Sequence, residues 1–317
     1  MKNTVKGIFC IIGSAFCFAL MAVFVKLSGN IYFVQKTFFR NFVAFFVAVL
    51  MLAREARKNG FASLKLPEGV FILLIARSIT GTVGIFGNFY AVDNLLLSDA
   101  AMLNKMSPFF TLVFSCFLLK EKLKPLQIFA VCGAFAGAML IIKPGFQFSS
   151  STAAAAGFAS GLGAGFAHCF IRKLSQKNCN GTVIIAFFSA FSMAVSLPYI
   201  IFNFQPMTVR QVILLLCAGV AATGGQFGIT AAYFAAPARE ISIFDYSQII
   251  FSASLGFFLF GQIPDILSFT GYAVIILMAV INFLYNKKLH HQMLLQGLDE
   301  TSNRTSFQAA DKMEKKE

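Results

Sequence analysis

Long apolar segments dominate this sequence and constrain what it can fold into. About 20 consecutive apolar residues cross a bilayer as a helix, and ten segments qualify: residues 7–27, 33–53, 69–92, 98–119, 125–143, 153–172, 182–202, 211–236, 241–261 and 265–286. A barrel would instead show segments of about ten residues with alternating polarity. The sequence therefore predicts an all-α integral membrane protein with ten transmembrane helices.

The composition agrees with a membrane protein and excludes a water-soluble fold. Of 317 residues, 58% are hydrophobic and 12% are charged, whereas soluble domains carry about 25% charged residues. The mean hydropathy is +0.76. The net charge of +13 is explained by Lys and Arg in cytoplasmic loops rather than by nucleic-acid binding. We therefore expect the lipid bilayer, and no nucleic acid, as a partner.

The distribution of Lys and Arg predicts the orientation. With the N-terminus inside, fifteen cations fall on the cytoplasmic side: Lys2, Lys6, Arg54, Arg57, Lys58, Lys65, Lys120, Lys122, Lys124, Arg172, Lys173, Lys177, Arg239, Lys287 and Lys288. The opposite loops hold only Lys143 and Arg210, with Lys26 and Lys36 near helix ends. Because cytoplasmic loops are enriched in these residues, we expect a multi-pass protein of the inner (plasma) membrane with both termini cytoplasmic.

Two further features concern the tail and the cysteines. Residues 289–317 are polar and mixed in charge, which predicts a disordered cytoplasmic tail. The seven cysteines form no CxxC pair, so neither a disulfide framework nor a metal site is indicated. We expect no cofactor.

The second half of the chain repeats the first weakly. At an offset of 141 residues, Gly84, Phe86, Gly87 and Ala91 match Gly225, Phe227, Gly228 and Ala232, and Asp99 matches Glu240. Five helices per half place the second half upside down in the membrane. The sequence therefore predicts two inverted five-helix repeats, residues 1–145 and 146–288.

Several motifs resemble a known family. They are Val25-Lys-Leu-Ser28, Phe38-Phe-Arg-Asn41, Met102-Leu-Asn-Lys-Met-Ser-Pro-Phe-Phe110, Leu118-Leu-Lys-Glu121 and Phe260-Gly-Gln-Ile-Pro264. Over about residues 7–286 the chain resembles the EamA type of the drug/metabolite transporter superfamily, which has ten helices in two repeats. The resemblance implies a secondary transporter of small metabolites without naming a substrate. Gln262 departs from the family pattern, which often has Glu there.

Four formal charges lie inside apolar segments. They are Arg40, Arg77, Lys105 and Asp245, and each costs about 2.5–3.5 kcal/mol at a helix centre. Such groups usually face a bundle interior or a water-filled cavity, although snorkelling or an internal ion pair is the structural alternative. Three cations against one acid favour an anionic or zwitterionic solute, such as an amino acid or a related carboxylate.

Polar residues form stripes beside these charges. Arg77, Gly81, Gly84 and Asn88 share one helical face, as do Asp245, Gln248 and Ser252. Another stripe is Thr223, Gln226, Thr230 and Tyr233, and Pro108 is expected to kink its helix. Helix–helix hydrogen bonding is the alternative explanation for the uncharged members. The candidate substrate-binding or gating residues are Arg40, Arg77, Asn88, Asn104, Lys105, Gln226, Asp245, Tyr246 and Gln248.

A glycine stripe and a pair of gates complete the predictions. Gly157, Gly161 and Gly165 indicate a close-packing helix face, which His168 continues as a hydrogen-bonded residue or a proton carrier. At the 141 offset, Asn104-Lys105 aligns with Asp245-Tyr246. This alignment predicts two gates at opposite depths, with Asp245 able to pair with Arg77.

The sequence thus predicts a carrier that works by alternating access on a small-molecule substrate, as a monomer or homodimer. One alternative is an exporter of cationic drugs or metabolites that uses Asp245. The others are a channel and a membrane-embedded enzyme or sensor. No GxSxG, HExxH or P-loop motif is present, so we expect no enzyme.

Overall fold

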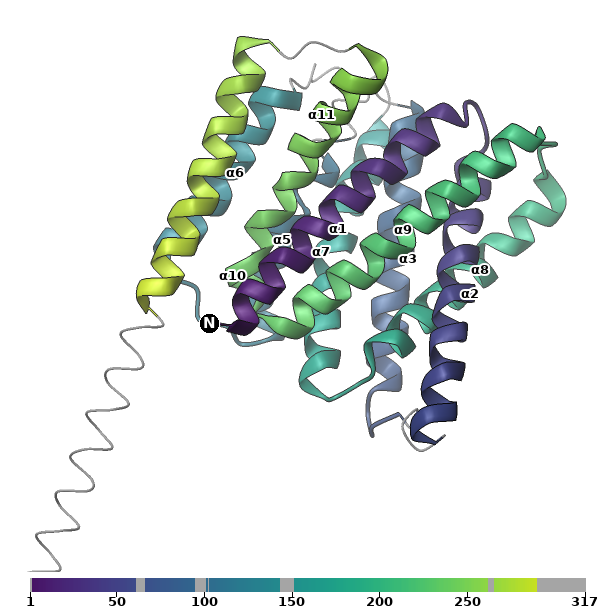
Figure 1. Ribbon diagram of the computed structural model, residues 1–317, viewed down its shortest axis with the longest axis horizontal. Helices are drawn as coiled ribbons and strands as arrows, with labels where there is room; N and C mark the ends of the chain where they lie inside the picture. The colour runs from purple at the N-terminus through teal and green to yellow at the C-terminus, as the bar shows by residue number, and fades with distance from the viewer. Residues whose placement is uncertain are drawn as a thin grey trace, which may run out of the picture.

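The computed structural model describes residues 2–60, 66–94, 101, 103–142, 151–261 and 265–289, and the regular structure in these ranges is helical (Figure 1). Eight helices there are long and apolar enough to cross a membrane. Seven are continuous: α1 (Lys2–Leu27), α2 (Phe33–Asn59), α3 (Phe71–Asn94), α7 (Ser151–Gln176), α8 (Gly181–Asn203), α9 (Val209–Ala235) and a final helix, Ile266–Leu289. The predicted tail and Gln262 lie outside the described residues.

The remaining elements complete the ten predicted helical segments. α5 (Ser107–Leu118) and α6 (Pro125–Ile142) are shorter apolar helices. The eighth long segment is composite and consists of α10 (Ala238–Ile241), the 3-10 helix η2 (Ser242–Tyr246) and α11 (Ser247–Phe260). The prediction of an all-α membrane protein with ten helical segments is confirmed.

The fourth predicted helix, residues 98–119, is broken rather than kinked. Lys105 and Met106 form a turn, and α5 begins at Ser107. Pro108 therefore lies in the first turn of α5, where a missing N–H is tolerated. The ninth segment is interrupted at the equivalent place. Its regular helix α11 begins at Ser247, within one residue of the position that matches Ser107 at the 141 offset. Lys105 lies in the first of these irregular stretches, and Asp245 lies in the second.

Helices of the first half pack against helices of the second half in corresponding pairs, as expected for two similar halves. α1 packs along α9, and α7 packs along α3, so each half contributes one helix to each pair (Figure 1). Gly87 and Gly228, which match in the repeat, lie at these two contacts. A Cβ on Gly87 would collide with the Ala156 carbonyl oxygen. A Cβ on Gly228 would lie 3.0 Å from the Cys10 carbonyl oxygen. These glycines let the backbones approach closely.

α6 and the final helix form another pair. A Cβ added to Gly137 would lie 3.0 Å from the Gly271 carbonyl oxygen, and one added to Gly271 would lie 2.5 Å from that of Gly137. In Figure 1 this pair stands at one side of the bundle. The pair again joins one helix of each half.

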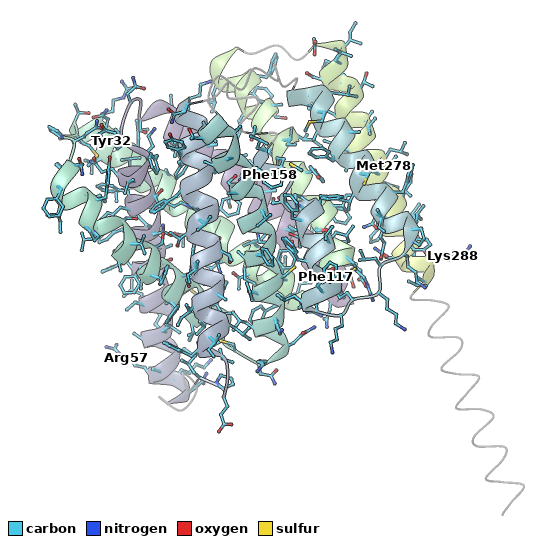
Figure 2. The ribbon with its side chains drawn as sticks, turned by 180° about the vertical axis from the view of Figure 1, so that it is seen from behind. Tyr32, Arg57, Phe117, Phe158, Met278 and Lys288 are labelled. Carbon is cyan, nitrogen blue, oxygen red and sulfur yellow. The ribbon has the colours of Figure 1, made fainter. Side chains whose placement is uncertain are left out.

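The start of α1 and the end of the final helix lie on one side of the helical bundle. Figure 1 places the N-terminus and the end of the final helix on the same side. Arg57 and Lys288, both predicted to be cytoplasmic, lie on that side in Figure 2. We refer to this side as the termini side.

Candidate functional site

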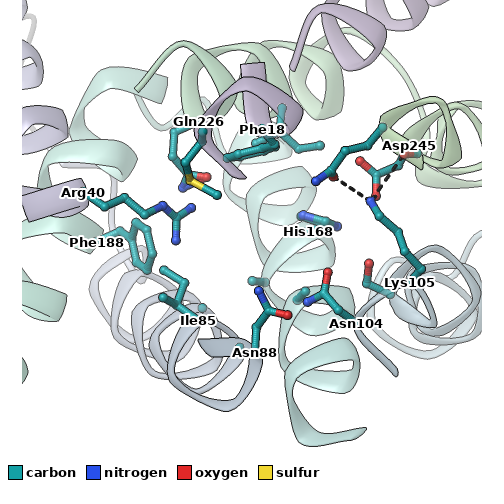
Figure 3. A pocket seen from close by; sticks show the side chains of 18 of the residues that line it. Phe18, Arg40, Ile85, Asn88, Asn104, Lys105, His168, Phe188, Gln226 and Asp245 are labelled. Carbon is teal, nitrogen blue, oxygen red and sulfur yellow. Dashed lines mark hydrogen bonds and ion pairs between the residues drawn. The ribbon is translucent and has the colours of Figure 1, made fainter. Parts of the chain in front are cut away.

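A cavity of about 140 Å³ lies at the junction of the two halves (Figure 3). Its walls come from α1, α2, α3, α7, α8 and α9, together with the irregular stretches before α5 and α11. Eight of the nine candidate residues line it: Arg40, Arg77, Asn88, Asn104, Lys105, Gln226, Asp245 and Gln248. The cavity therefore gathers polar groups that are far apart in the sequence.

Arg77 is held in the wall by an aromatic ring and a glycine. Its guanidinium carbon lies 3.8 Å from the centre of the Phe188 ring on α8, a cation–π distance. The side chain is 3% exposed, and its Nε and Nη1 atoms are buried without a hydrogen-bond partner. Gly81, one turn along α3, leaves room for this arrangement, because a Cβ there would collide with Arg77 Nη1. The result is a buried cation with unused donors.

Gly81 allows a test of this arrangement. We expect Gly81→Ala to push the guanidinium off Phe188, because the new Cβ would also lie 2.9 Å from a carbon of that ring. The affinity for an anionic solute should fall about tenfold, while the protein remains folded. Isothermal titration with succinate and a melting curve measure both. Gly13→Ala, a site with nothing within 4 Å, is the control; unchanged affinity in Gly81→Ala would contradict the role of Gly81.

Arg40 supplies a second cation from α2. Its guanidinium carbon lies 5.7 Å from the centre of the Phe18 ring, and its Nε atom is buried without a hydrogen-bond partner. Figure 3 shows the side chain reaching into the cavity. Among the described residues, no carboxylate lies within ion-pair distance of Arg40 or Arg77. The cavity thus contains two cations that no carboxylate of the described residues neutralises.

The third cation of the cavity is already paired. Lys105 Nζ lies 3.2 Å from Asp245 Oδ2 and donates to Gln248 Oε1 at 2.7 Å (Figure 3). The Asp245 carbonyl oxygen is 3.5 Å from the same nitrogen. Lys105 and Asp245 are both buried. The pair joins the irregular stretches of the two halves.

This pairing corrects the predicted gates. Lys105 and Asp245 do not lie at opposite depths, and Asp245 pairs with Lys105 rather than with Arg77. The prediction was wrong because it started the ninth helix at residue 241, whereas α10 starts at Ala238 and places Asp245 further into the segment. In addition, the long lysine side chain extends from a turn rather than from a regular helix.

Tyr246 is the candidate residue that does not line the cavity. Its side chain is fully buried in an apolar cluster with neighbours that include Leu112, Val131 and Ile275. Four members of the predicted stripes also lie outside the cavity lining: Thr223, Thr230, Tyr233 and Ser252. Thr223 donates its hydroxyl to the Gly219 carbonyl oxygen within α9, and Ser252 is exposed on α11.

His168 was predicted in an interface, and it also borders the cavity. The ring stacks on Tyr233 with centroids 5.1 Å apart, and Nδ1 lies 3.5 Å from Thr111 Oγ1. Figure 3 shows the ring between Arg40 and Lys105. The cavity residues missing from the candidate set are Phe18, Met21, Gly81, Gly84, Ile85, Phe89, Ser107, Ala164, Ala167, His168, Phe188 and Ile229. Among them, His168, Gly81 and Gly84 had a signal in the sequence, as continuations of glycine or polar stripes.

The predicted glycine face of α7 is confirmed. A Cβ on Gly161 would collide with the Leu103 carbonyl oxygen, and one on Gly165 would lie 2.7 Å from Phe110 Cβ. A Cβ on Gly157 would lie 2.7 Å from the Leu103 side chain. These contacts hold α7 against the stretch that carries Asn104 and Lys105.

An apolar cluster lies between the cavity and the termini side. It contains residues from the starts of α1, α3 and α8 and from the ends of α7 and α9, including Ile11, Leu74, Ile184, Leu174 and Tyr233. The cavity residues of α1, α3 and α7 lie further from that end. At the same side, the Arg239 backbone N–H donates to Glu121 Oε2 at 3.3 Å. Burial raises the pKa of the Glu121 carboxyl, while this hydrogen bond lowers it.

The last two features concern possible metal ligands and the thiol groups of the chain. Across the ranges that the structure describes, no group of three or more His, Cys, Asp or Glu side chains is placed to hold a metal ion. The seven cysteines are free thiols.

A helical bundle with a polar cavity between two related halves is the architecture of a membrane transporter. A family model described as the EamA-like transporter family matches residues 5–143. The chain belongs to this family and is a multi-pass membrane transporter of the drug/metabolite type.

Relatives along most of the chain agree with this assignment. The Pseudopaline exporter CntI of Pseudomonas aeruginosa is 31% identical over 286 residues, covering 89% of this chain and 97% of the relative. An uncharacterized transporter of Helicobacter pylori is 27% identical, covering 87% of this chain and 94% of the relative. Human Solute carrier family 35 member G1 is 26% identical, covering 81% and 73%. A solved crystal structure shares the fold, with a TM-score of 0.75 and 18% identity over 90% of this chain and 98% of that one.

Proposed function

We propose that this transporter carries a small anionic solute, a carboxylate or a similar anion, by alternating access. The observation behind the proposal is the pair of guanidinium groups, Arg40 and Arg77, that face the cavity without a carboxylate partner among the described residues. Arginine binds carboxylates by two parallel hydrogen bonds, and the buried Nε and Nη1 atoms of Arg77 have no hydrogen-bond partner among the described residues. The cavity volume of about 140 Å³ suits a small solute.

The charge balance favours an anion over the other solutes considered. Asp245 is the acid of the described cavity lining, and Lys105 already neutralises it. A cationic drug would have to displace Lys105 and then remain beside two arginines. The ammonium group of a zwitterion would meet the same obstacle. We therefore place carboxylates ahead of the cation-exporter alternative.

Export from the cytoplasm is the direction that we propose. It is supported by the 31% identical relative, which is named as an exporter. The moving parts would be the halves 1–145 and 146–288, since inverted repeats rock against each other around a shared site. Candidate groups for the two ends of the cavity are three further lining residues, Asn88, Asn104 and Gln226.

The inner membrane, with the termini side facing the cytoplasm, is the proposed setting. The cation count in the loops supports this orientation, as does the position of Arg57, Lys288 and the N-terminus on one side. We expect an alkaline phosphatase reporter fused after Lys288 to be inactive and a fluorescent-protein reporter there to be active. Phosphatase activity at that site would contradict the orientation and leave an odd number of crossings.

Ligand stabilisation of the purified protein tests the charge of the solute. A ligand at about 100 times its Kd stabilises the folded state by about 2.7 kcal/mol, so we expect carboxylates such as succinate to raise the Tm by about 5 °C or more. Matched diamines such as putrescine should not. Arg40→Gln should abolish the shift, whereas Arg210→Gln, on an exposed residue outside the cavity, should keep it. Stabilisation by the diamine alone would overturn the proposal.

Counterflow in proteoliposomes tests the carrier mechanism. A carrier exchanges unlabelled internal succinate for labelled external succinate, so the label should accumulate transiently inside the vesicles. Equilibration without such accumulation would indicate a channel and would contradict alternating access.

A further inference from the structure

The Lys105–Asp245 pair lies in the same cavity as the two arginines, and the proposed function gives it no role in choosing among anions. The pair and its neighbour Gln248 come from both halves: Lys105 precedes α5, Asp245 lies in η2, and Gln248 lies in the first turn of α11. Lys105 Nζ contacts both Asp245 and Gln248, at 3.2 Å and 2.7 Å. The ammonium group is therefore turned toward η2 and α11 instead of toward a solute.

From this contact we propose that Asp245 sets the charge of the solute by masking Lys105. The inference rests on the proposed function, since it concerns the same cavity. The described lining contains three cations and one acid, and the ion pair leaves the cavity with a charge of about +2. A solute with two carboxylates neutralises this charge, whereas one with a single carboxylate leaves a guanidinium without a counterion.

Because a buried cavity has a low dielectric, the match between the charge of the solute and the charge of the cavity has a large effect on affinity. A charge left without a partner there is costly, and each additional opposite charge at contact distance is worth at least a factor of ten in affinity. Discrimination then works in both directions. A monocarboxylate loses an interaction with an arginine, and the third carboxylate of a tricarboxylate finds Lys105 occupied by Asp245.

The pair offers three variants whose expected effects form a series. Asp245→Asn removes the acid, frees Lys105 and raises the cavity charge to about +3. Lys105→Gln leaves Asp245 unpaired and lowers the cavity charge to about +1. The double variant Lys105→Gln/Asp245→Asn removes both charges and restores about +2. Asparagine and glutamine keep the approximate size and polarity of the residues that they replace.

The experiment measures the Kd of butyrate, succinate and tricarballylate for the purified full-length protein. We expect the wild type to bind succinate at least tenfold more tightly than butyrate, with no further gain for tricarballylate. Asp245→Asn should shift the preference at least tenfold toward tricarballylate, and Lys105→Gln should shift it at least tenfold toward butyrate. The double variant should return to the wild-type order. A melting curve verifies that each variant is folded.

The outcomes separate this inference from the proposed function. If the wild type binds carboxylates and neither folded single variant changes the order, the masking role is wrong while the anion carrier stands. A double variant that keeps the altered order of either single variant would also overturn the masking role. If the wild type binds none of the three carboxylates, both proposals fail. Should Asp245→Asn not fold, the opposite shift in Lys105→Gln still decides the question.

Discussion

Replacing Arg77 with lysine should lower the rate of succinate transport by about 10- to 100-fold while the protein still inserts into the membrane. Lysine keeps the charge, but it lacks the planar fork that binds a carboxylate through two hydrogen bonds, and its ammonium group is more strongly hydrated. It also cannot lie flat on Phe188 as the guanidinium does at 3.8 Å. A loss of about 1.4–2.8 kcal/mol corresponds to this range of rates.

The measurement is the initial rate of labelled succinate uptake into proteoliposomes, normalised to the amount of inserted protein. Arg210→Lys, the same exchange on an exposed residue, should leave the rate unchanged. A normal rate in Arg77→Lys would show that Arg77 contributes only charge or packing.

The second large effect should come from Gly161 and concerns stability. A Cβ at this position would collide with the backbone carbonyl oxygen of Leu103, and the nearest side chain, Met106, would lie 3.4 Å away. Backbone atoms cannot rotate aside, so we expect Gly161→Val to destabilise the protein by about 3 kcal/mol. The Tm should fall by about 10 °C.

A melting curve of the purified variant in detergent measures this shift. Gly13→Val introduces the same β-branched side chain into α1, where no atom lies within 4 Å, and it should change the Tm by less than 2 °C, about 0.5 kcal/mol. Equal Tm values for the two variants would mean that the α7 contact with Leu103 is not tight.

The architecture could be predicted because membrane insertion leaves few choices. Apolar segments of about 20 residues must become helices, and their count follows from hydropathy. The cavity residues could be predicted for a related reason. Arg40, Arg77, Lys105 and Asp245 are too costly to face lipid, so an interior position was the remaining solution, and the structure places all four at one cavity.

The partners of these residues could not be predicted, because they depend on where regular helix is interrupted. The turn at Lys105 and the 3-10 segment around Asp245 change the depth of both side chains, and no hydropathy pattern marks either interruption. Phe188 stacks on Arg77 across a contact between α3 and α8 that leaves no trace in local sequence. Tyr246 follows a charged residue in the chain, yet it packs into an apolar cluster.

The pairing of α1 with α9 and of α3 with α7 has a consequence for biosynthesis. α1 ends at Leu27 and α9 begins at Val209, so 181 residues lie between α1 and its partner. At a synthesis rate of about 5–20 residues per second, α1 is in the membrane for about 10–40 s before α9 has been synthesised. Gly84 and Gly87 of α3, which lie against α7, likewise have no partner until α7 has been synthesised. An isolated first half therefore lacks the surfaces that hold it together, and the two halves should assemble only with each other, like the chains of an obligate heterodimer.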